Sequence, residues 1–219
     1  MRLQSAIFDM DGTLLDSMPV WEHLCSDLLR EQGVDPEPDL DAIVGTMTIR
    51  QGAEYCKTRY QLTQSVDELE TLTHAKVEDF YRNRVQAKPG VQKFLSLLKM
   101  EGVWMYVATN TARYLAEAAL RCAGIDQYFR GIITCAEVRQ GKRESPEIYL
   151  RAMRRLRGNF KDTVVFEDAL HAAQTAKAAG FRVAAVYDAS AAADQEALKA
   201  LADYYIPSFE EMFEARTLG

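Results

Sequence analysis

The sequence predicts an α/β protein in which helices cover both faces of a parallel sheet and an all-helical segment interrupts the chain early. Short apolar runs alternate with amphipathic helical patterns from about residue 85 onward, and this alternation is typical of parallel sheets. A further apolar run stands near the start of the chain, at residues 3–9. Between them, residues 17–84 show only helical periodicity. These three observations predict one α/β domain with a helical insertion.

The first element is expected to be a buried strand at Leu3–Asp9, because its apolar run ends at a turn that contains Gly12. One helix is expected to follow, since Ser17 is typical of an N-cap and Gly33 of a helix end. Helical spacing of apolar residues predicts further helices in the insertion at residues 40–44, 49–60 and 65–84. We therefore expect a core domain made of residues 1–16 and 85–219, and a helical domain made of residues 17–84.

The remainder of the chain alternates between helix and strand. A helix is expected to begin at Val91, after Pro89-Gly90, and to end at Gly102. Apolar runs predict strands at residues 103–108, 132–133, 163–166 and 182–187. Helical patterns between these runs predict helices at residues 115–122, from Ser145-Pro146 onward, and at residues 169–179. The alternation continues to Ile206.

Polar side chains follow several of the predicted strands. In open parallel sheets, ligands bind beyond the carboxyl ends of the strands, so these side chains are expected to meet in one crevice. They are Asp9 and Asp11 after the first strand, Thr109 and Asn110 after the second, Lys142 in the loop after the third, and Glu167 and Asp168 after the fourth.

This set of side chains suits Mg²⁺ and a phosphate group. Magnesium prefers carboxylate oxygens, water and substrate phosphate, and Asp9 and Asp168 could supply the carboxylates. The expected phosphate-binding residues are Thr109, Asn110 and Lys142. Lys142 offers a compact positive charge, and the Thr109 hydroxyl with nearby backbone N–H groups could hold phosphate oxygens. The two carboxylates around Met10 suggest a division of labour, in which Asp9 attacks phosphorus and Asp11 transfers protons.

The segment Asp9–Ser17, which reads D-M-D-G-T-L-L-D-S, resembles the first motif of the haloacid dehalogenase-like (HAD) superfamily, D-x-D-G-T. Thr109, Lys142 and the pair Glu167-Asp168 match its second, third and fourth motifs in order. The place of the helical insertion resembles the beta-phosphoglucomutase/phosphoglycolate phosphatase branch. The resemblance implies a Rossmann-like three-layer α/β/α core with a helical cap domain at residues 17–84.

The resemblance also implies roles for individual residues. Asp9 is the implied nucleophile, and Asp11 is the implied acid–base that also binds the metal through its backbone carbonyl. Asp168 is implied to be a metal ligand and Glu167 an ancillary one. The third motif departs from the family pattern, because one extra residue precedes Pro146. The reach of Lys142 is therefore left open.

A segment of the insertion, Gly45–Arg50, lies between two expected helices. In cap domains of this kind such a loop faces the active site and contacts the substrate. Arg50 is the candidate for binding an anionic or hydroxyl-rich part of the substrate, and a solvent-exposed arginine is the alternative.

The composition of the chain limits the classes of molecule that it is expected to bind. The chain has 219 residues, with 26 Lys and Arg against 32 Asp and Glu and a formal net charge of −6, which disfavours nucleic-acid binding because that depends on neutralising phosphates. No uncharged stretch is long enough for a transmembrane helix. The four cysteines are widely spaced and predict reduced thiols of a cytoplasmic protein. The expected partner is a small phosphorylated metabolite, and the expected state is a monomer or weak dimer.

The leading hypothesis is a Mg²⁺-dependent phosphatase that hydrolyses small phosphomonoesters through an aspartyl-phosphate. Sugar phosphates, phosphoglycolate and nucleotides are all possible substrates under this hypothesis.

The first alternative is a sugar phosphomutase of the beta-phosphoglucomutase type. Such mutases have a cap histidine twelve residues after the nucleophile, where this chain has Trp21. His23 would lie about 200° around the expected helix from Trp21. The second alternative is a non-catalytic regulatory relative.

Overall fold

The computed structural model describes residues 3–45, 47 and 49–211. The chain divides into two compact units. The α/β unit consists of Met1–Asp16 and Val85–Gly219, and the helical unit of Ser17–Arg84. Thr46 and Thr48, which belong to the segment expected to contact the substrate, lie outside the described residues.

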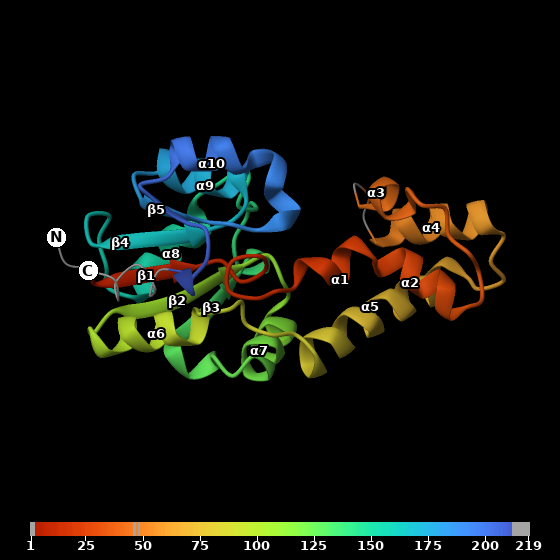
Figure 1. Ribbon diagram of the computed structural model, residues 1–219, viewed down its shortest axis with the longest axis horizontal. Helices are drawn as coiled ribbons and strands as arrows, with labels where there is room; N and C mark the ends of the chain where they lie inside the picture. Colours follow the sequence, from red (N-terminus) through yellow and green to blue (C-terminus); the bar gives the residue numbers. More distant parts are fainter. Residues whose placement is uncertain (1–2, 46, 48, 212–219) are drawn as a thin grey trace. The chain divides into compact units, whose positions relative to one another are not determined.

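The α/β unit is built on one parallel sheet, which Figure 1 shows with its strands labelled. Over the described residues the strand order is β3-β2-β1-β4-β5-β6, and every pair is parallel. The α/β prediction is therefore confirmed. The strands are β1 (Ser5–Phe8), β2 (Trp104–Thr109), β3 (Phe129–Thr134), β4 (Thr163–Glu167), β5 (Arg182–Val186) and β6 (Tyr204–Ile206).

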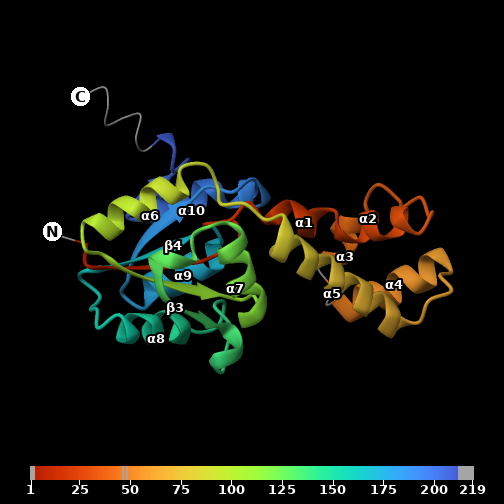
Figure 2. The ribbon, with the colours of Figure 1, turned by 90° about the horizontal axis from the view of Figure 1, so that it is seen from below.

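Helices cover both faces of this sheet. Alternate residues of a strand point to opposite faces, and β1 illustrates this. Ile7 packs with the helices α8, α9 and α10, whereas Phe8 stacks on Phe166 and contacts Phe94 of helix α6 on the other face. Figure 2 shows α6 and α8 on opposite sides of the strands. The helices are α6 (Val91–Met100), α7 (Arg113–Cys122), α8 (Glu147–Arg155), α9 (Leu170–Ala178) and α10 (Gln195–Leu201).

Strand β1 lies at the centre of the sheet, between β2 and β4. Its Phe8 is paired with Val107 of β2 and with Phe166 of β4. Asp9 is the next residue, and its backbone N–H donates to the Phe166 carbonyl at 2.9 Å. The chain therefore leaves β1 at the level at which β4 ends in Glu167, so the residues after both strands meet at one edge.

The edge strand β3 is longer than the two residues predicted for it. Its first half is partly exposed, as expected at a sheet edge, so Arg130 and Gly131 interrupt the apolar pattern. Gly131 has a packing reason, because a Cβ there would lie 2.7 Å from the Tyr106 hydroxyl.

The helical unit contains α1 (Met18–Glu22), α2 (Leu24–Glu31), α3 (Leu40–Val44), α4 (Ile49–Tyr60) and α5 (Val66–Asn83). The bounds predicted for α3 and α4 agree with the structure. Helix α5 begins with a capping box, in which Ser65 and Glu68 satisfy each other's backbone N–H groups. No helix over the described residues is long and apolar enough to cross a membrane.

The single helix predicted between Ser17 and Gly33 is wrong. The chain breaks at His23, which has φ −126° and ψ 10°. The break frees the backbone N–H groups of Cys25 and Ser26, and both donate to Asp41 Oδ1, at 3.0 and 3.2 Å. A carboxylate from α3 thus caps α2. Because His23 lies at this break, the argument that placed it by regular helical spacing from Trp21 no longer applies.

Candidate active site

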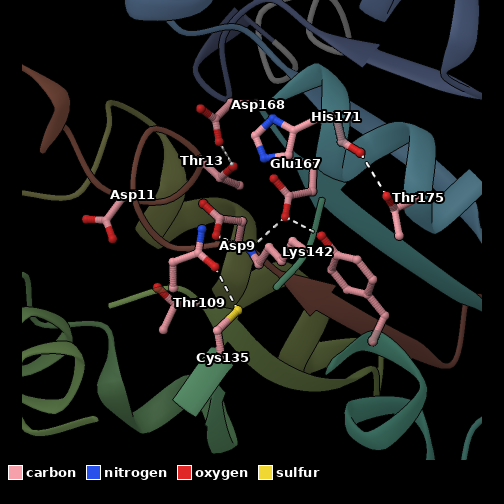
Figure 3. Close-up of polar contacts among 12 residues, drawn as sticks. Asp9, Asp11, Thr13, Thr109, Cys135, Lys142, Glu167, Asp168, His171 and Thr175 are labelled. Carbon is pink, nitrogen blue, oxygen red and sulfur yellow. Dashed lines mark hydrogen bonds and ion pairs between the residues drawn. The ribbon is translucent and has the colours of Figure 1, made fainter. Parts of the chain in front are cut away.

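The predicted polar residues of β1, β2 and β4 lie together at the carboxyl edge of the sheet (Figure 3). Asp9 follows β1, Thr109 ends β2 and Glu167 ends β4. Asp9, Glu167 and Asp168 each offer a carboxylate oxygen, and these oxygens all lie within 4.8 Å of one another. All three residues are buried, as is Thr109. The topology therefore gathers a compact acidic cluster beside a buried hydroxyl.

Lys142 lies inside this cluster. Its ammonium group contacts Asp9 Oδ1 and donates to Glu167 Oε1 at 2.7 Å, and its side chain is only 2% exposed. The Tyr149 hydroxyl donates to the same Glu167 oxygen, also at 2.7 Å. Figure 3 shows these contacts as dashed lines. Glu167 is thus held from two sides, and it holds the lysine against Asp9.

The extra residue before Pro146 does not prevent Lys142 from reaching the cluster. The loop forms a tight turn, in which the N–H groups of Glu144 and Ser145 donate to the Gly141 carbonyl at 3.1 and 3.0 Å. The turn takes up the additional residue between Lys142 and the start of α8. With this turn in place, the side chain of Lys142 reaches Asp9 and Glu167.

Burial sets the charge balance of the cluster. It raises the pKa of Asp9 well above the usual range, although the adjacent Lys142 acts in the opposite direction. Burial, followed by repulsion from Glu167, raises the pKa of Asp168 to about 7. Burial disfavours the charged form of Lys142, but Asp9 and Glu167 outweigh it and raise the pKa of this lysine.

The cluster fits a hard divalent cation. One ammonium faces three buried carboxylates, and carboxylates crowded in this way repel each other unless a cation lies among them. Their oxygens are the ligand type that Mg²⁺ prefers. Burial is the largest cause of the raised pKa values of Asp9 and Asp168, and the neighbouring carboxylates raise them further.

The turn after β1 brings the backbone close to Asp168. The N–H groups of Leu14 and Leu15 both donate to the Met10 carbonyl, and the Thr13 hydroxyl donates to Asp168 Oδ1 at 2.7 Å. Gly12 has φ +76°, and a Cβ on it would lie 2.4 Å from Asp168 Oδ2. Glycine is therefore required here both for the left-handed backbone and for the approach of the carboxylate.

The Gly12→Ala variant is expected to lose more stability than Gly102→Ala. Gly102 has a similar φ of +78°, but no atom of the described residues lies within 4 Å of an added Cβ. Both variants incur the left-handed penalty of roughly 1–2 kcal/mol, and only Gly12→Ala adds a clash of about 1–3 kcal/mol. Urea unfolding of both variants measures the difference. Equal midpoints would contradict the close approach of Asp168.

Asp11 and Asn110 lie at the margin of the site. The Asp11 side chain stands apart from Asp9 in Figure 3, and its Oδ2 accepts from the Thr111 hydroxyl at 2.7 Å. The Thr111 N–H donates to Thr109 Oγ1 at 3.0 Å. Asn110 is exposed, and its Oδ1 accepts from the Cys135 thiol at 2.7 Å. In this arrangement the Asn110 amide oxygen is occupied by a thiol donor.

Arg50 belongs to the helical unit, where acidic side chains surround its guanidinium. Nη1 lies 3.0 Å from Asp67 and 2.7 Å from Glu70, and Nε lies 3.6 Å from Glu54. The side chain is 56% exposed. The structure therefore gives Arg50 carboxylate partners within its own unit.

Sequence reasoning missed the roles of several side chains at the site. Thr13 lies within the quoted D-x-D-G-T motif, so its contact with Asp168 had a visible signal. Tyr149 had none, because it stands on the apolar face of α8. His171 belongs to none of the motifs quoted above, and in Figure 3 its ring lies beside Glu167. Burial, followed by the positive charge of Arg143, lowers its pKa.

Comparison with known proteins identifies relatives over most of the chain. The family profile of the haloacid dehalogenase-like hydrolases matches residues 3–180. Phosphorylated carbohydrates phosphatase of Thermotoga maritima is 27% identical over 81% of this chain and 82% of the relative. Hexitol phosphatase A of Escherichia coli is 30% identical over 85% of this chain and 84% of the relative.

Solved structures give the same result for the fold. A Thermotoga maritima protein provisionally named beta-phosphoglucomutase superposes with a TM-score of 0.84 at 25% identity, over 99% of both chains. The resemblance seen in the motifs is confirmed by these matches. The chain belongs to the haloacid dehalogenase-like hydrolase family.

Proposed function

We propose that this protein is a Mg²⁺-dependent phosphatase of small phosphorylated carbohydrates that acts through an aspartyl-phosphate on Asp9. The observation that supports this most is the buried ammonium of Lys142, which is held between Asp9 and Glu167. Two relatives are named phosphorylated carbohydrates phosphatase and hexitol phosphatase A, and these names favour a sugar phosphate over phosphoglycolate or a nucleotide.

In the proposed reaction, a carboxylate oxygen of Asp9 attacks phosphorus and the bond from phosphorus to the leaving oxygen breaks. Asp11 gives its proton to that oxygen, and the free alcohol departs. Asp11 then takes a proton from water, whose oxygen attacks the phosphorus and releases Asp9 and inorganic phosphate. Thr111, which donates to Asp11 Oδ2, holds this carboxyl group in place.

The remaining side chains bind and orient. The Thr109 hydroxyl accepts from the Thr111 N–H and retains its own proton, which it can donate to a phosphate oxygen. Lys142 keeps Asp9 oriented and offsets negative charge. Asp9 and Asp168 would hold Mg²⁺, with the Asp11 backbone carbonyl and with Glu167 as an ancillary ligand. Magnesium, when bound, would neutralise the crowded carboxylates and the phosphate.

Phosphate release from a panel of sugar phosphates, phosphoglycolate and nucleoside monophosphates tests the proposal. We expect release with Mg²⁺, loss of release with EDTA and the highest rates with sugar phosphates. Asp168→Asn is expected to lose roughly 100-fold or more in turnover at fixed Mg²⁺, because it removes a ligand charge. Asp126→Asn, at an exposed position of the same unit, is the matched control. Equal release in Mg²⁺ and in EDTA would contradict the metal requirement.

The provisional name of the Thermotoga maritima structure favours a sugar phosphomutase as the second candidate. The phosphatase remains preferred, because Trp21 stands twelve residues after Asp9 where such mutases have histidine. Without that residue, water is the acceptor for the phosphoryl group. Activation of turnover by a sugar bisphosphate, with isomeric sugar phosphate as the product in place of inorganic phosphate, would favour the mutase.

A further inference from the structure

Two cysteines from different helices meet in the helical unit. Cys25 lies in α2 and Cys56 in α4, and both line an apolar cavity of about 170 Å³. Cys56 is buried, and Cys25 packs against the same hydrophobic cluster. The proposed phosphatase chemistry uses neither residue.

The two thiols interact directly. Both side chains line the same cavity and belong to the same hydrophobic packing. Interaction with Cys56, followed by burial, raises the pKa of Cys25. The interaction with Cys25 lowers the pKa of Cys56, against the effect of burial. Stabilising one sulfur in its anionic form makes it the better nucleophile.

The surroundings hold this pair in place. Asp41 accepts the N–H of Cys25 at 3.0 Å and so fixes the start of α2. Gln32 also lines the cavity, and over the described residues its Oε1 is a buried oxygen with no hydrogen-bond partner. The cavity is therefore lined by two thiols and by a residue with a buried acceptor. Its volume is more than ten times the roughly 10–15 Å³ that one water molecule needs, so a small peroxide can enter.

The other two cysteines differ from this pair. The Cys122 thiol donates to the Val85 carbonyl at 3.5 Å, and the Cys135 thiol donates to Asn110 Oδ1 at 2.7 Å. Both are engaged with oxygen atoms of the α/β unit. The chain thus contains its own control thiols.

We propose that Cys25 and Cys56 form a peroxide-sensitive dithiol site that closes to an intramolecular disulfide. The Cys56 thiolate attacks an oxygen of hydrogen peroxide, so that an S–O bond forms, the O–O bond breaks and hydroxide leaves to take up a proton as water. Cys25, on losing its proton, attacks the Cys56 sulfenic acid. An S–S bond forms, the S–O bond breaks and a second water leaves. Both thiols are oxidised and the peroxide is reduced.

The test treats the reduced full-length protein with hydrogen peroxide and measures intact mass, free thiols and the tryptic map without reductant. We expect loss of the mass of two hydrogen atoms and a fall from four titratable thiols to two. The map should link the peptide Gln51–Lys57, which contains Cys56, to Leu3–Arg30, which contains Cys25. A reducing phosphine should restore the original mass and thiol number.

Variants separate this site from the other cysteines. Cys25→Ser and Cys56→Ser should each abolish the mass loss, whereas Cys122→Ser and Cys135→Ser should retain it. A link that involves Cys122 or Cys135 would overturn the proposal. So would oxygen addition to Cys56 without cross-linking, or four free thiols after a treatment that oxidises an added dithiol peptide.

Discussion

Replacing Asp9 by asparagine is expected to reduce turnover of the best phosphomonoester substrate by ~10⁴-fold or more, because an amide cannot serve as the attacking oxygen. The fold should persist. Lys142 keeps its 2.7 Å contact with Glu167, so its buried ammonium remains compensated. Burial raises the pKa of Asp9, which means that burial disfavours its charged form. A neutral amide at this position therefore removes one of the crowded negative charges and should not destabilise the fold.

The measurement is kcat for Asp9→Asn beside the exposed control Asp126→Asn, with far-UV circular dichroism and the unfolding midpoint of both. Deamidation of the new asparagine would regenerate aspartate, so intact mass must be recorded on the assayed sample. Wild-type turnover in a sample whose mass confirms asparagine would refute Asp9 as the nucleophile. A strong loss with an unchanged midpoint would support it.

The strands were predictable from the sequence where burial on both faces leaves an uninterrupted apolar run. This condition holds for β1 and β4, whose residues are all buried. It fails for the first half of the edge strand β3. The break at His23 was not predictable by local rules, because its stabilising partner, Asp41, comes from a different helix.

The location of the candidate site was predictable for a topological reason. Parallel strands end at the same edge, so residues that follow β1, β2 and β4 must approach one another. Lys142 follows no strand directly, and its position depends on the turn between Gly141 and Ser145. The contact of Tyr149 with Glu167 depends on the rotation of α8 about its axis against the sheet. Apolar periodicity predicts which face of α8 is buried, but it does not predict which residue of the sheet each side chain contacts.

Replacing Lys142 by methionine is expected to destabilise the metal-free protein by about 3–5 kcal/mol, the usual cost of removing one partner from a buried charge pair. Methionine preserves much of the volume of the lysine stem, so lost packing contributes little. The loss comes from Asp9 and Glu167, whose side chains are 10% and 1% exposed and would then face each other without the ammonium. Turnover should also fall by roughly 100-fold or more.

Urea unfolding without Mg²⁺ compares Lys142→Met with Lys161→Met, whose lysine is exposed and whose midpoint should match the wild type. The double variant Lys142→Met with Glu167→Gln identifies the cause. If uncompensated charge is responsible, removing the Glu167 charge must recover part of the loss, because only one ionised carboxylate of the pair remains. If packing were responsible, the second substitution would add to the loss. Partial recovery would therefore establish that the lysine stabilises this fold by neutralising the carboxylates between which it lies.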